Sequence, residues 1–425
     1  MEPTKANIDK EDQAQVTTTN GQANAWFHKY FLDGQKYECG VVHAADPDAT
    51  FYQKHRKIIA LLTPAIVVHI AWWTIAIIND NFHLFTETSG SKESPNWIMS
   101  ITMVFGSLVA GSTSEGGAAV AFPVMTLALG ISPKIARDFS FMIQSVGMTA
   151  SSYTILSMRV KVEWNALKWV TLGGVAGIIF GLEQIAPRLA PAFAKMYFVV
   201  IWSSFAVGLY LLNRNWDRKV YNDVQNLEEA VLWRAPGASL GKYVHFNWKL
   251  FTLLMFGFVG GIFSSVAGSG IDICSFACLT LLFRICEKVA TPTSVVLMAI
   301  NTCVGFAYRE WGMGGVASEA WPIFFVCVPI VVFGAPIGSF LGSYLHRLTL
   351  AGIIYFIDTI QLIGALVIVQ PWTTKKTEEP LILTTTSAAI FLGGMISFAT
   401  LSHTGLKLSQ AEGGNDASGL KEINR

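Results

Sequence analysis

Long apolar runs separated by short polar segments dominate this chain. A helix that crosses a bilayer needs about 20 mostly apolar residues, and most of the runs have that length. The pattern therefore predicts an all-α polytopic membrane protein. The runs that qualify as single spans are 58–78, 139–158, 166–186, 196–212, 289–308, 320–345, 350–370 and 381–402.

Two further runs are too long for one span. Residues 97–130 and 250–283 each contain 34 residues and a single acid, Glu115 in the first and Asp272 in the second. Stretches rich in glycine and hydroxyl groups interrupt them, at 111–117 and 268–270. We interpret each run as two short helices joined by a break. This reading gives about twelve membrane segments and places both termini on the same side.

The distribution of positive charge predicts which side that is. Counted from residue 54, the segments on the side of the N-terminus carry 18 Lys and Arg, and those on the other side carry 8. Cytoplasmic loops carry the excess of positive charge. We therefore expect both termini in the cytosol, and we expect the protein to lie in the plasma membrane. The expected parts are a cytosolic segment at 1–57, a first span and outer loop at 58–96, a cytosolic loop at 213–248, a last span at 371–402 and a cytosolic tail at 403–425.

Composition supports the membrane assignment and narrows the function. Of the 425 residues, 52% are hydrophobic and 14% are charged, whereas a soluble domain carries about 25% charged residues. A disordered chain, a coiled coil and almost any soluble enzyme are excluded on this basis. The net charge of +1 gives no reason to expect nucleic acid as a partner. The six cysteines lack zinc-like spacing and are read as small buried residues, so no metal and no cofactor is expected.

An internal repeat relates the two halves of the chain. A gapless shift of 154 residues places segment 97–212 on segment 249–370 and aligns the two breaks. An odd number of segments in each unit means that the second copy enters the membrane from the opposite side. This predicts two inverted repeats of five segments, the architecture of many secondary transporters; the alternative is that glycine-rich helices resemble each other by composition. The identical pairs are Gly106/Gly260, Gly116/Gly270, Phe122/Phe276, Thr126/Thr280, Leu127/Leu281, Ile131/Ile285, Lys134/Lys288, Ala136/Ala290 and Ser140/Ser294.

The two breaks are the candidate binding site. Irregular backbone persists at membrane depth only where protein or water surrounds it, and opposed broken helices can direct free N–H groups and hydroxyls at one point. Such a point suits a small oxyanion. The alternative reading of the glycines is tight helix packing. The candidate substrate-binding residues are Ser112, Thr113, Ser114, Gly116, Gly117, Gly268, Ser269, Gly270, Ser140, Gln144, Ser294 and Asn301.

Three acids fall inside the predicted spans. Glu115 and Asp272 lie at the breaks, and Asp358 lies in the middle of a later span. Ionisable groups inside membranes are costly and are usually functional, so each is a candidate proton-coupling residue. The alternative for the first two is capping of a broken helix end, and for Asp358 a hydrogen bond to a neighbouring span. Arg137 and Arg284, at the ends of the broken pairs, could recruit anions, but the sequence favours interface anchors.

The first break also carries a family resemblance. The stretch 111–127, GSTSEGGAAVAFPVMTL, resembles the glycine-rich signature of the TauE/SafE sulfite exporter family, followed here by Lys134, Ala136 and Ser140. The second copy, around 268–294, is weaker, and Ala277 stands where the first has Pro123. The resemblance implies transport of sulfite, sulfonates or related organosulfur anions.

The sequence is therefore read as a transporter of small anions that works by alternating access and is not an enzyme. Its expected partners are a small anionic solute and the lipid bilayer, and a homo-oligomer is compatible with the pattern. No nucleotide-binding loop is present, so a proton or anion gradient is the expected driving force. The alternatives are a membrane enzyme, for which the acids are too scattered, and a non-transporting scaffold or subunit.

Overall fold

The computed structural model describes residues 26–27, 30–31, 51–88, 94–214, 220–225, 231–234, 245–373 and 379–423. Within them the chain forms twelve α-helices and two small β-hairpins. Eight helices are long and apolar enough to cross a membrane. The predicted α-helical, multi-pass membrane protein is confirmed. Most of the predicted segment 1–57 lies outside the described residues.

The unbroken helices begin and end close to the predicted spans. Their bounds are α3 Phe51–Ile78, α6 Pro133–Ser157, α7 Trp164–Phe180, α8 Pro191–Arg214, α11 Glu287–Ala307, α12 Ala320–Tyr344, α13 Arg347–Val369 and α14 Pro380–Ile423. The hairpins pair β1 Glu87–Thr88 with β2 Ser94–Pro95, and β3 Val231–Arg234 with β4 His245–Asn247. The largest difference is at the end of α14, which continues to Ile423, well past the predicted span end at 402.

Both long runs are broken helices, as the sequence predicts. The first consists of α4 Trp97–Ser112 and α5 Ala118–Pro123, extended by the π-helical turn η2 Val124–Ala128. The second consists of α9 Trp248–Ala267 and α10 Ile271–Ala277, extended by the π-helical turn η5 Cys278–Leu282. The two π-helical turns are related by the same shift of 154 residues as the breaks.

Contacts between helix ends define one face of the bundle, called here the N-terminal face. Arg56 Nε near the start of α3 donates to Ser157 O at the end of α6 over 2.6 Å. Lys161, just beyond, pairs with Asp223 over 2.7 Å. Two residues away, Tyr221 contacts Ser409 of α14 over 3.2 Å. The described start of α3 and the far end of the last span therefore lie on the same face, which is marked by Arg56, Ser157, Tyr221 and Ser409.

The two broken segments enter the bundle from opposite faces. The first starts at the far face, because Asn96, directly before α4, donates to His83 O, which follows the end of α3. The second starts at the N-terminal face, where Lys249 at the start of α9 donates to Gln225 O. Each segment turns back at its break, and Arg284, after η5, returns to Tyr221 on the N-terminal face.

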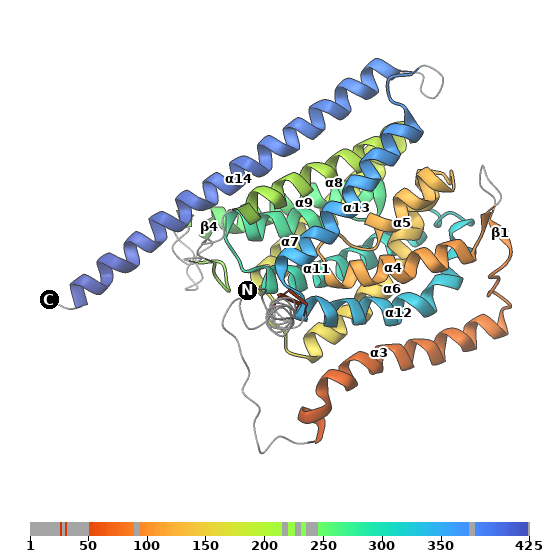
Figure 1. Cartoon of the computed structure of the whole chain (residues 1–425), viewed down its shortest axis with the longest axis horizontal. Helices are drawn as coiled ribbons and strands as arrows, with labels where there is room; N and C mark the ends of the chain where they lie inside the picture. Colours follow the sequence, from red (N-terminus) through yellow and green to blue (C-terminus); the bar gives the residue numbers. More distant parts are fainter. Residues whose placement is uncertain are drawn as a thin grey trace, which may run out of the picture.

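Packing places α6 and α11 at the centre. They contact each other, and α6 also packs against α12 while α11 packs against α7. Helix α6 carries several buried Ser and Thr residues and Gln144, and it is not among the eight helices that are long and apolar enough to cross a membrane. The peripheral helices α3 and α14 lie on opposite sides of the bundle (Figure 1).

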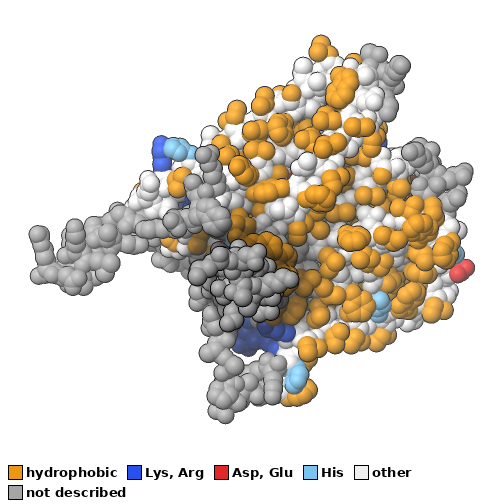
Figure 2. Space-filling view, in the orientation of Figure 1, with side chains coloured by type: hydrophobic (Ala, Val, Ile, Leu, Met, Phe, Trp, Pro, Cys, Tyr) orange, Lys and Arg blue, Asp and Glu red, His pale blue; other side chains and the backbone are white. Residues whose placement is uncertain are grey.

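The lateral surface is apolar. Large side chains such as those of Ile77, Phe105, Phe356 and Leu381 are more than half exposed, and Figure 2 shows hydrophobic side chains covering most of the visible flank. A soluble monomer rarely exposes contiguous apolar patches of this extent, so this surface is suited to lipid.

Candidate substrate and proton site

The first break is capped by its own hydroxyls. Thr113 Oγ1 donates to Val109 O over 2.8 Å and accepts the N–H of Glu115 over 3.3 Å. Ser112 Oγ contacts Val109 O, and the Cα of Ser112 faces Gly342 of α12. Gly116 then takes a φ of +72°, which non-glycine residues rarely adopt. Ser112 and Thr113 therefore shape the break, and the buried Ser114 Oγ has no hydrogen-bond partner within the described part of the chain.

Gly111, predicted as part of this break, belongs to α4 instead. A Cβ at this position would collide with the backbone oxygen of Ala335 in α12, so its role is close helix packing. The packing interpretation holds for this glycine, and the irregular backbone starts two residues later.

The second break uses two glycines and a serine. Gly268 ends α9 with a φ of +83°, and Gly270 has a φ of +153°. Ser264 Oγ accepts the N–H of Ile271 over 3.1 Å, which caps the first turn of α10. Ser269 lies between the two glycines with its hydroxyl directed at the first break.

The structure brings the two breaks together. Ser269 Oγ donates to the backbone oxygen of Glu115 over 3.3 Å, and Gln144 Nε2 donates to Gly268 O over 2.9 Å. A Cβ on Gly116 would lie 2.8 Å from Asp272 Oδ2 and 2.6 Å from Met298 Sδ. Residues of α6, α10 and α11 thus meet the two breaks at the predicted point, and Glu115, Ser269 and Asp272 are closed to solvent.

Asp272 caps a broken helix end. Its carboxylate accepts the hydroxyl of Ser269 and the N–H of Gly270, each over 2.7 Å. A carboxylate at a helix N-terminus is stabilised by the free N–H groups and by the helix dipole. These are the contacts expected for the capping role, one of the two roles that the sequence left open for this acid.

Glu115 has a different environment. No described N–H or hydroxyl donor reaches its two carboxyl oxygens or those of Asp358. Instead the two carboxyl groups lie against each other, close enough for a hydrogen bond whenever one of them is protonated. A hydrogen bond holds α13 close to the first break. Gln361 of α13 donates through Nε2 to Ala119 O, at the start of α5, over 2.7 Å, and this contact brings Asp358 near Glu115. The acid in the middle of a later span is therefore part of the same site.

The remaining predicted residues divide into two groups. Ser140 contacts Gly268 through its Cβ, and Gly117 lies against Gln144, so both line the breaks. Asn301 is adjacent, because its Oδ1 and the side chain of Ile271 both face Gly174. Ser294 is buried and donates to Thr291 O in its own helix over 2.8 Å, and no described contact connects it to a break.

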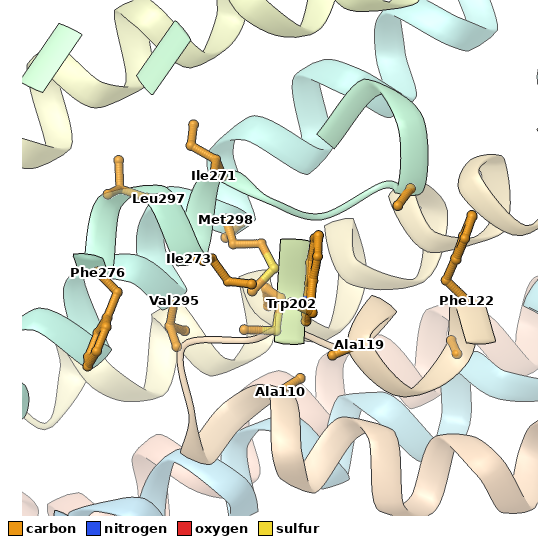
Figure 3. Close-up of a cluster of buried hydrophobic side chains, with 14 of the residues drawn as sticks. Ala110, Ala119, Phe122, Trp202, Ile271, Ile273, Phe276, Val295, Leu297 and Met298 are labelled. Carbon is orange, nitrogen blue, oxygen red and sulfur yellow. The ribbon is translucent and has the colours of Figure 1, made fainter. Parts of the chain in front are cut away.

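Trp202 was not found by the sequence analysis. It is fully buried on α8, and none of the residues that the structure describes accepts a hydrogen bond from its Nε1–H. Figure 3 shows it among Ala119, Ile273 and Met298 beside the breaks. A tryptophan inside an apolar run carries no signal of this kind, because only the packing of α8 against the broken helices brings the indole here.

The arginines at the helix ends are not anchors at the membrane surface. Arg137 and Arg309 are both buried, and both donate to the carboxylate of Asp138, with shortest distances of 2.8 Å. The N–H of Ala317 also donates to this carboxylate over 3.0 Å. Arg284 is buried on the N-terminal face, where its Nη2 donates to Ser402 O over 2.8 Å. The favoured anchor interpretation, which was made for Arg137 and Arg284, is therefore wrong.

The charge balance at the breaks limits the chemistry. Three acids meet there, and the contacts described for them include no Lys, Arg or His side chain. Among the described residues, the groups without a hydrogen-bond partner near the breaks include the Ser114 hydroxyl, the Trp202 N–H, the carboxyl pair and the amide oxygens of Gln144 and Asn301. An anion could use the two donors only where the nearby acids are capped or protonated, since unpaired like charges repel strongly in a medium of low dielectric constant.

Comparison with known proteins agrees with this arrangement. The family model described as sulfite exporter TauE/SafE matches residues 98–365, a range that includes both breaks, the carboxyl pair and Trp202. Searches of curated proteins and of solved structures find no significant match. The family is one of membrane transporters for sulfur anions, and it is typically non-enzymatic. With more than half of the chain matched, the protein belongs to the TauE/SafE sulfite exporter family.

Proposed function

We propose that this protein transports a small sulfur oxyanion, such as sulfite, or an organosulfonate by alternating access, and that a proton moves with the anion. The Glu115–Asp358 carboxyl pair supports this proposal most directly. Two buried carboxylates with no cation beside them are costly, and a shared proton removes part of that cost. The same proton makes the site less negative, which an incoming anion requires.

The proposed roles follow from the geometry. The Ser114 hydroxyl and the Trp202 N–H donate to the anion, while Ser269, Gly268 and Gly270 hold the second break in place. Glu115 and Asp358 carry the proton. Asp272 has a capping role and is not needed as a carrier, because two donors already satisfy its carboxylate.

An inverted repeat fits the packing. Under the 154-residue shift, α4 corresponds to α9 and α12 to α7, and the close packing of α4 against α12 has its counterpart in that of α7 against α9. The broken segments also enter from opposite faces. These observations support two inverted units of five segments, 97–212 and 249–370, which could rock about the buried breaks. Burial of the breaks from both faces is the occluded arrangement that such a cycle passes through.

Uptake into proteoliposomes tests the proposed function. Purified protein is reconstituted, and entry of labelled sulfite, thiosulfate, taurine and sulfate is measured with and without an imposed pH gradient. We expect at least one solute to enter faster when the outside is more acidic. Ser114→Ala should slow that solute, whereas Ser397→Ala, on the peripheral helix α14, should not.

A non-transporting scaffold or subunit is the second candidate. It predicts that none of these solutes enters and that Glu115→Gln leaves assembly of the protein unchanged. The long exposed apolar faces of α3 and α14 would then serve as contact surfaces for another membrane protein.

A further inference from the structure

A buried ion cluster lies between the far face and the breaks. Helix α6 ends at Ser157 on the N-terminal face, so it begins at the far face, and Arg137 and Asp138 lie near its start. Gln144, which donates to the second break, follows Asp138 by six residues, or about 9 Å of helix. The backbone oxygen of Arg137 lies 2.9 Å from the position of a Cβ added to Gly268. An anion that moves along α6 from the far face to the breaks must therefore pass this cluster.

The cluster joins the two halves of the chain. Asp138 belongs to the first predicted unit, and Arg309, in the π-helical turn η6 Tyr308–Gly312, belongs to the second. Arg309 donates from Nε to Oδ1 of Asp138 over 3.0 Å and from Nη2 to Oδ2 over 2.8 Å. The N–H of Ala317, also in the second unit, donates to Oδ2 over 3.0 Å. Three hydrogen bonds thus cross between the units at a carboxylate that is closed to solvent.

Apolar side chains close the same crossing. Phe141, Ile178 and Leu182 of the first unit are buried together, and Phe306 of the second unit packs against them. Gly305 permits this approach, since an added Cβ would lie only 2.5 Å from the Phe141 ring. A hydrophobic cluster and a buried ion pair therefore hold the two units together on the far side of the breaks.

Asp138 keeps a partner if the two units separate. Arg137, its neighbour in α6, also donates to Oδ1, from Nε over 3.0 Å and from Nη2 over 2.8 Å. Arg309 instead moves with the second unit, where its Nη2 also donates to Gly315 O over 3.0 Å. Among the described residues, the adjacent Glu310 accepts a backbone N–H and forms no ion pair with Arg309. Separation therefore leaves Asp138 paired with Arg137 and leaves Arg309 without its carboxylate.

We propose that the Asp138–Arg309 pair is the far gate of the anion pathway, and that the released Arg309 guanidinium is the first ligand of an oxyanion entering from this face. This gate rests on the alternating access proposed above. Asp138 presents two carboxylate oxygens to Nε and Nη2 of Arg309, and an oxyanion presents the same pair of oxygens. Because the guanidinium can bind the anion only after its release from Asp138, the anion favours the open state.

The corresponding positions at the N-terminal face carry no charge. Under the shift of 154 residues, Asp138 corresponds to Pro292 and Arg309 to Ile155. These two residues lie near the start of α11 and near the end of α6, both at the N-terminal face. The ion pair is therefore a property of the far gate alone, and an anion acts directly on that gate.

Chemical modification of a cysteine placed beneath the gate tests its opening. Ser140→Cys puts a thiol beside Gly268 in the second break, and the purified full-length protein is treated with a polar maleimide. Peptide mass spectrometry measures modification at position 140 and at the native Cys327, which is fully buried in α12. We expect Arg309→Gln on this background to raise the rate at position 140 by about tenfold or more and to leave Cys327 unmodified. An unchanged rate at position 140 overturns the gate.

A matched control and a second variant protect this test from unfolding. Arg188→Gln is the control, because Arg188 is an exposed far-face arginine that donates to Gln184 in its own segment over 3.1 Å, and neither rate should change. If Arg309→Gln also exposes Cys327, Arg309→Lys decides, since it keeps the charge but loses the two parallel bonds. We then expect a several-fold rise at position 140 with Cys327 unmodified, and no rise overturns the gate.

Added sulfate tests the role of Arg309 as a ligand. At constant ionic strength, sulfate in place of chloride should raise the rate at position 140 when Ser140→Cys is the only change, and should have no effect once Arg309→Gln is added. Equal rates in sulfate and chloride contradict the ligand role.

None of these rates depends on solute uptake. A gate that opens in a protein that transports nothing would count against the proposed function alone. Uptake by a protein whose modification rates do not respond to Arg309→Gln would count against the gate alone.

Discussion

Ser269 Oγ donates a hydrogen bond to the backbone oxygen of Glu115 over 3.3 Å, and the two residues are 154 positions apart in the chain. The same shift relates the two halves of the sequence. Thr149 and Cys303, also 154 positions apart, contact each other over 3.7 Å on α6 and α11. Residues that correspond in two repeats touch only near the axis relating them, so these contacts are consistent with a two-fold pseudo-axis between the breaks.

The carboxyl pair should act as a unit. Glu115→Gln and Asp358→Asn are each expected to lower pH-driven anion uptake by at least about tenfold, and the double variant should be no slower than the slower single variant. The reason is that either substitution removes the site at which one proton is shared. Glu183→Gln, on the far face and outside the site, is the control. Fully additive losses would mean that the two acids work independently.

Gly116 should not tolerate a side chain. An added Cβ would lie 2.6–2.8 Å from Met298 Sδ, Gln144 Oε1 and Asp272 Oδ2, at a φ of +72°. Gly116→Ala is therefore expected to lower the thermal unfolding midpoint and to abolish uptake. Gly364→Ala is the matched control, because nothing lies within 4 Å of its added Cβ in α13, and it should stabilise the helix by up to about 1 kcal/mol. Similar midpoints for the two variants would show that the breaks are loosely packed.

Asp138 should be a main determinant of stability at the far face. Removing the carboxylate leaves Arg137 and Arg309 buried with no shared counter-charge, so Asp138→Asn is expected to destabilise the protein by about 3–5 kcal/mol. The exposed pair Lys161–Asp223 offers a control, and Asp223→Asn should cost about 0–1 kcal/mol. Denaturant unfolding in detergent measures both, and a small effect at Asp138 would contradict the buried network.

Glu163, before α7, predicts a pH dependence of stability. Burial raises the pKa of its carboxyl above the ordinary value, although the N–H groups of Asn165 and Val224 donate to it. The folded state therefore favours the protonated form, and this contribution to stability is lost as pH rises from about 4.5 through the raised pKa. The variant Glu163→Gln does not lose this contribution. The difference between its thermal unfolding midpoint and that of the wild type should therefore shift in favour of the variant as pH rises over that window. Glu379→Gln, at an exposed acid, is the control, and a constant difference at Glu163 would exclude the effect.

The sequence was sufficient for the parts of the fold that depend on local pattern. Apolar length predicted the unbroken spans, and the glycine and hydroxyl stretches predicted both breaks within a few residues. Thr113 and Ser269 illustrate why. Their hydroxyls bond to backbone or carboxylate groups only three or four positions away, so a short stretch of sequence is enough to predict these bonds.

The partners of the buried acids could not be predicted in this way. Asp272 is capped by Ser269 and Gly270, which lie close before it in the chain, but Glu115 meets an acid more than two hundred positions away. Which of two similar acids is capped and which is paired depends on the position of α13. The same is true of Trp202 and of the arginines around Asp138, because tertiary packing alone brings their partners close.

Measurement of proton entry during anion uptake tests the central claim most directly. Proteoliposomes loaded with a pH-sensitive dye, and held at zero membrane potential, receive the transported sulfur anion on the outside. The account predicts that the interior acidifies as the anion enters, and that Glu115→Gln abolishes this acidification. Anion entry at the wild-type rate without any change in internal pH, or acidification that persists in Glu115→Gln, would contradict it.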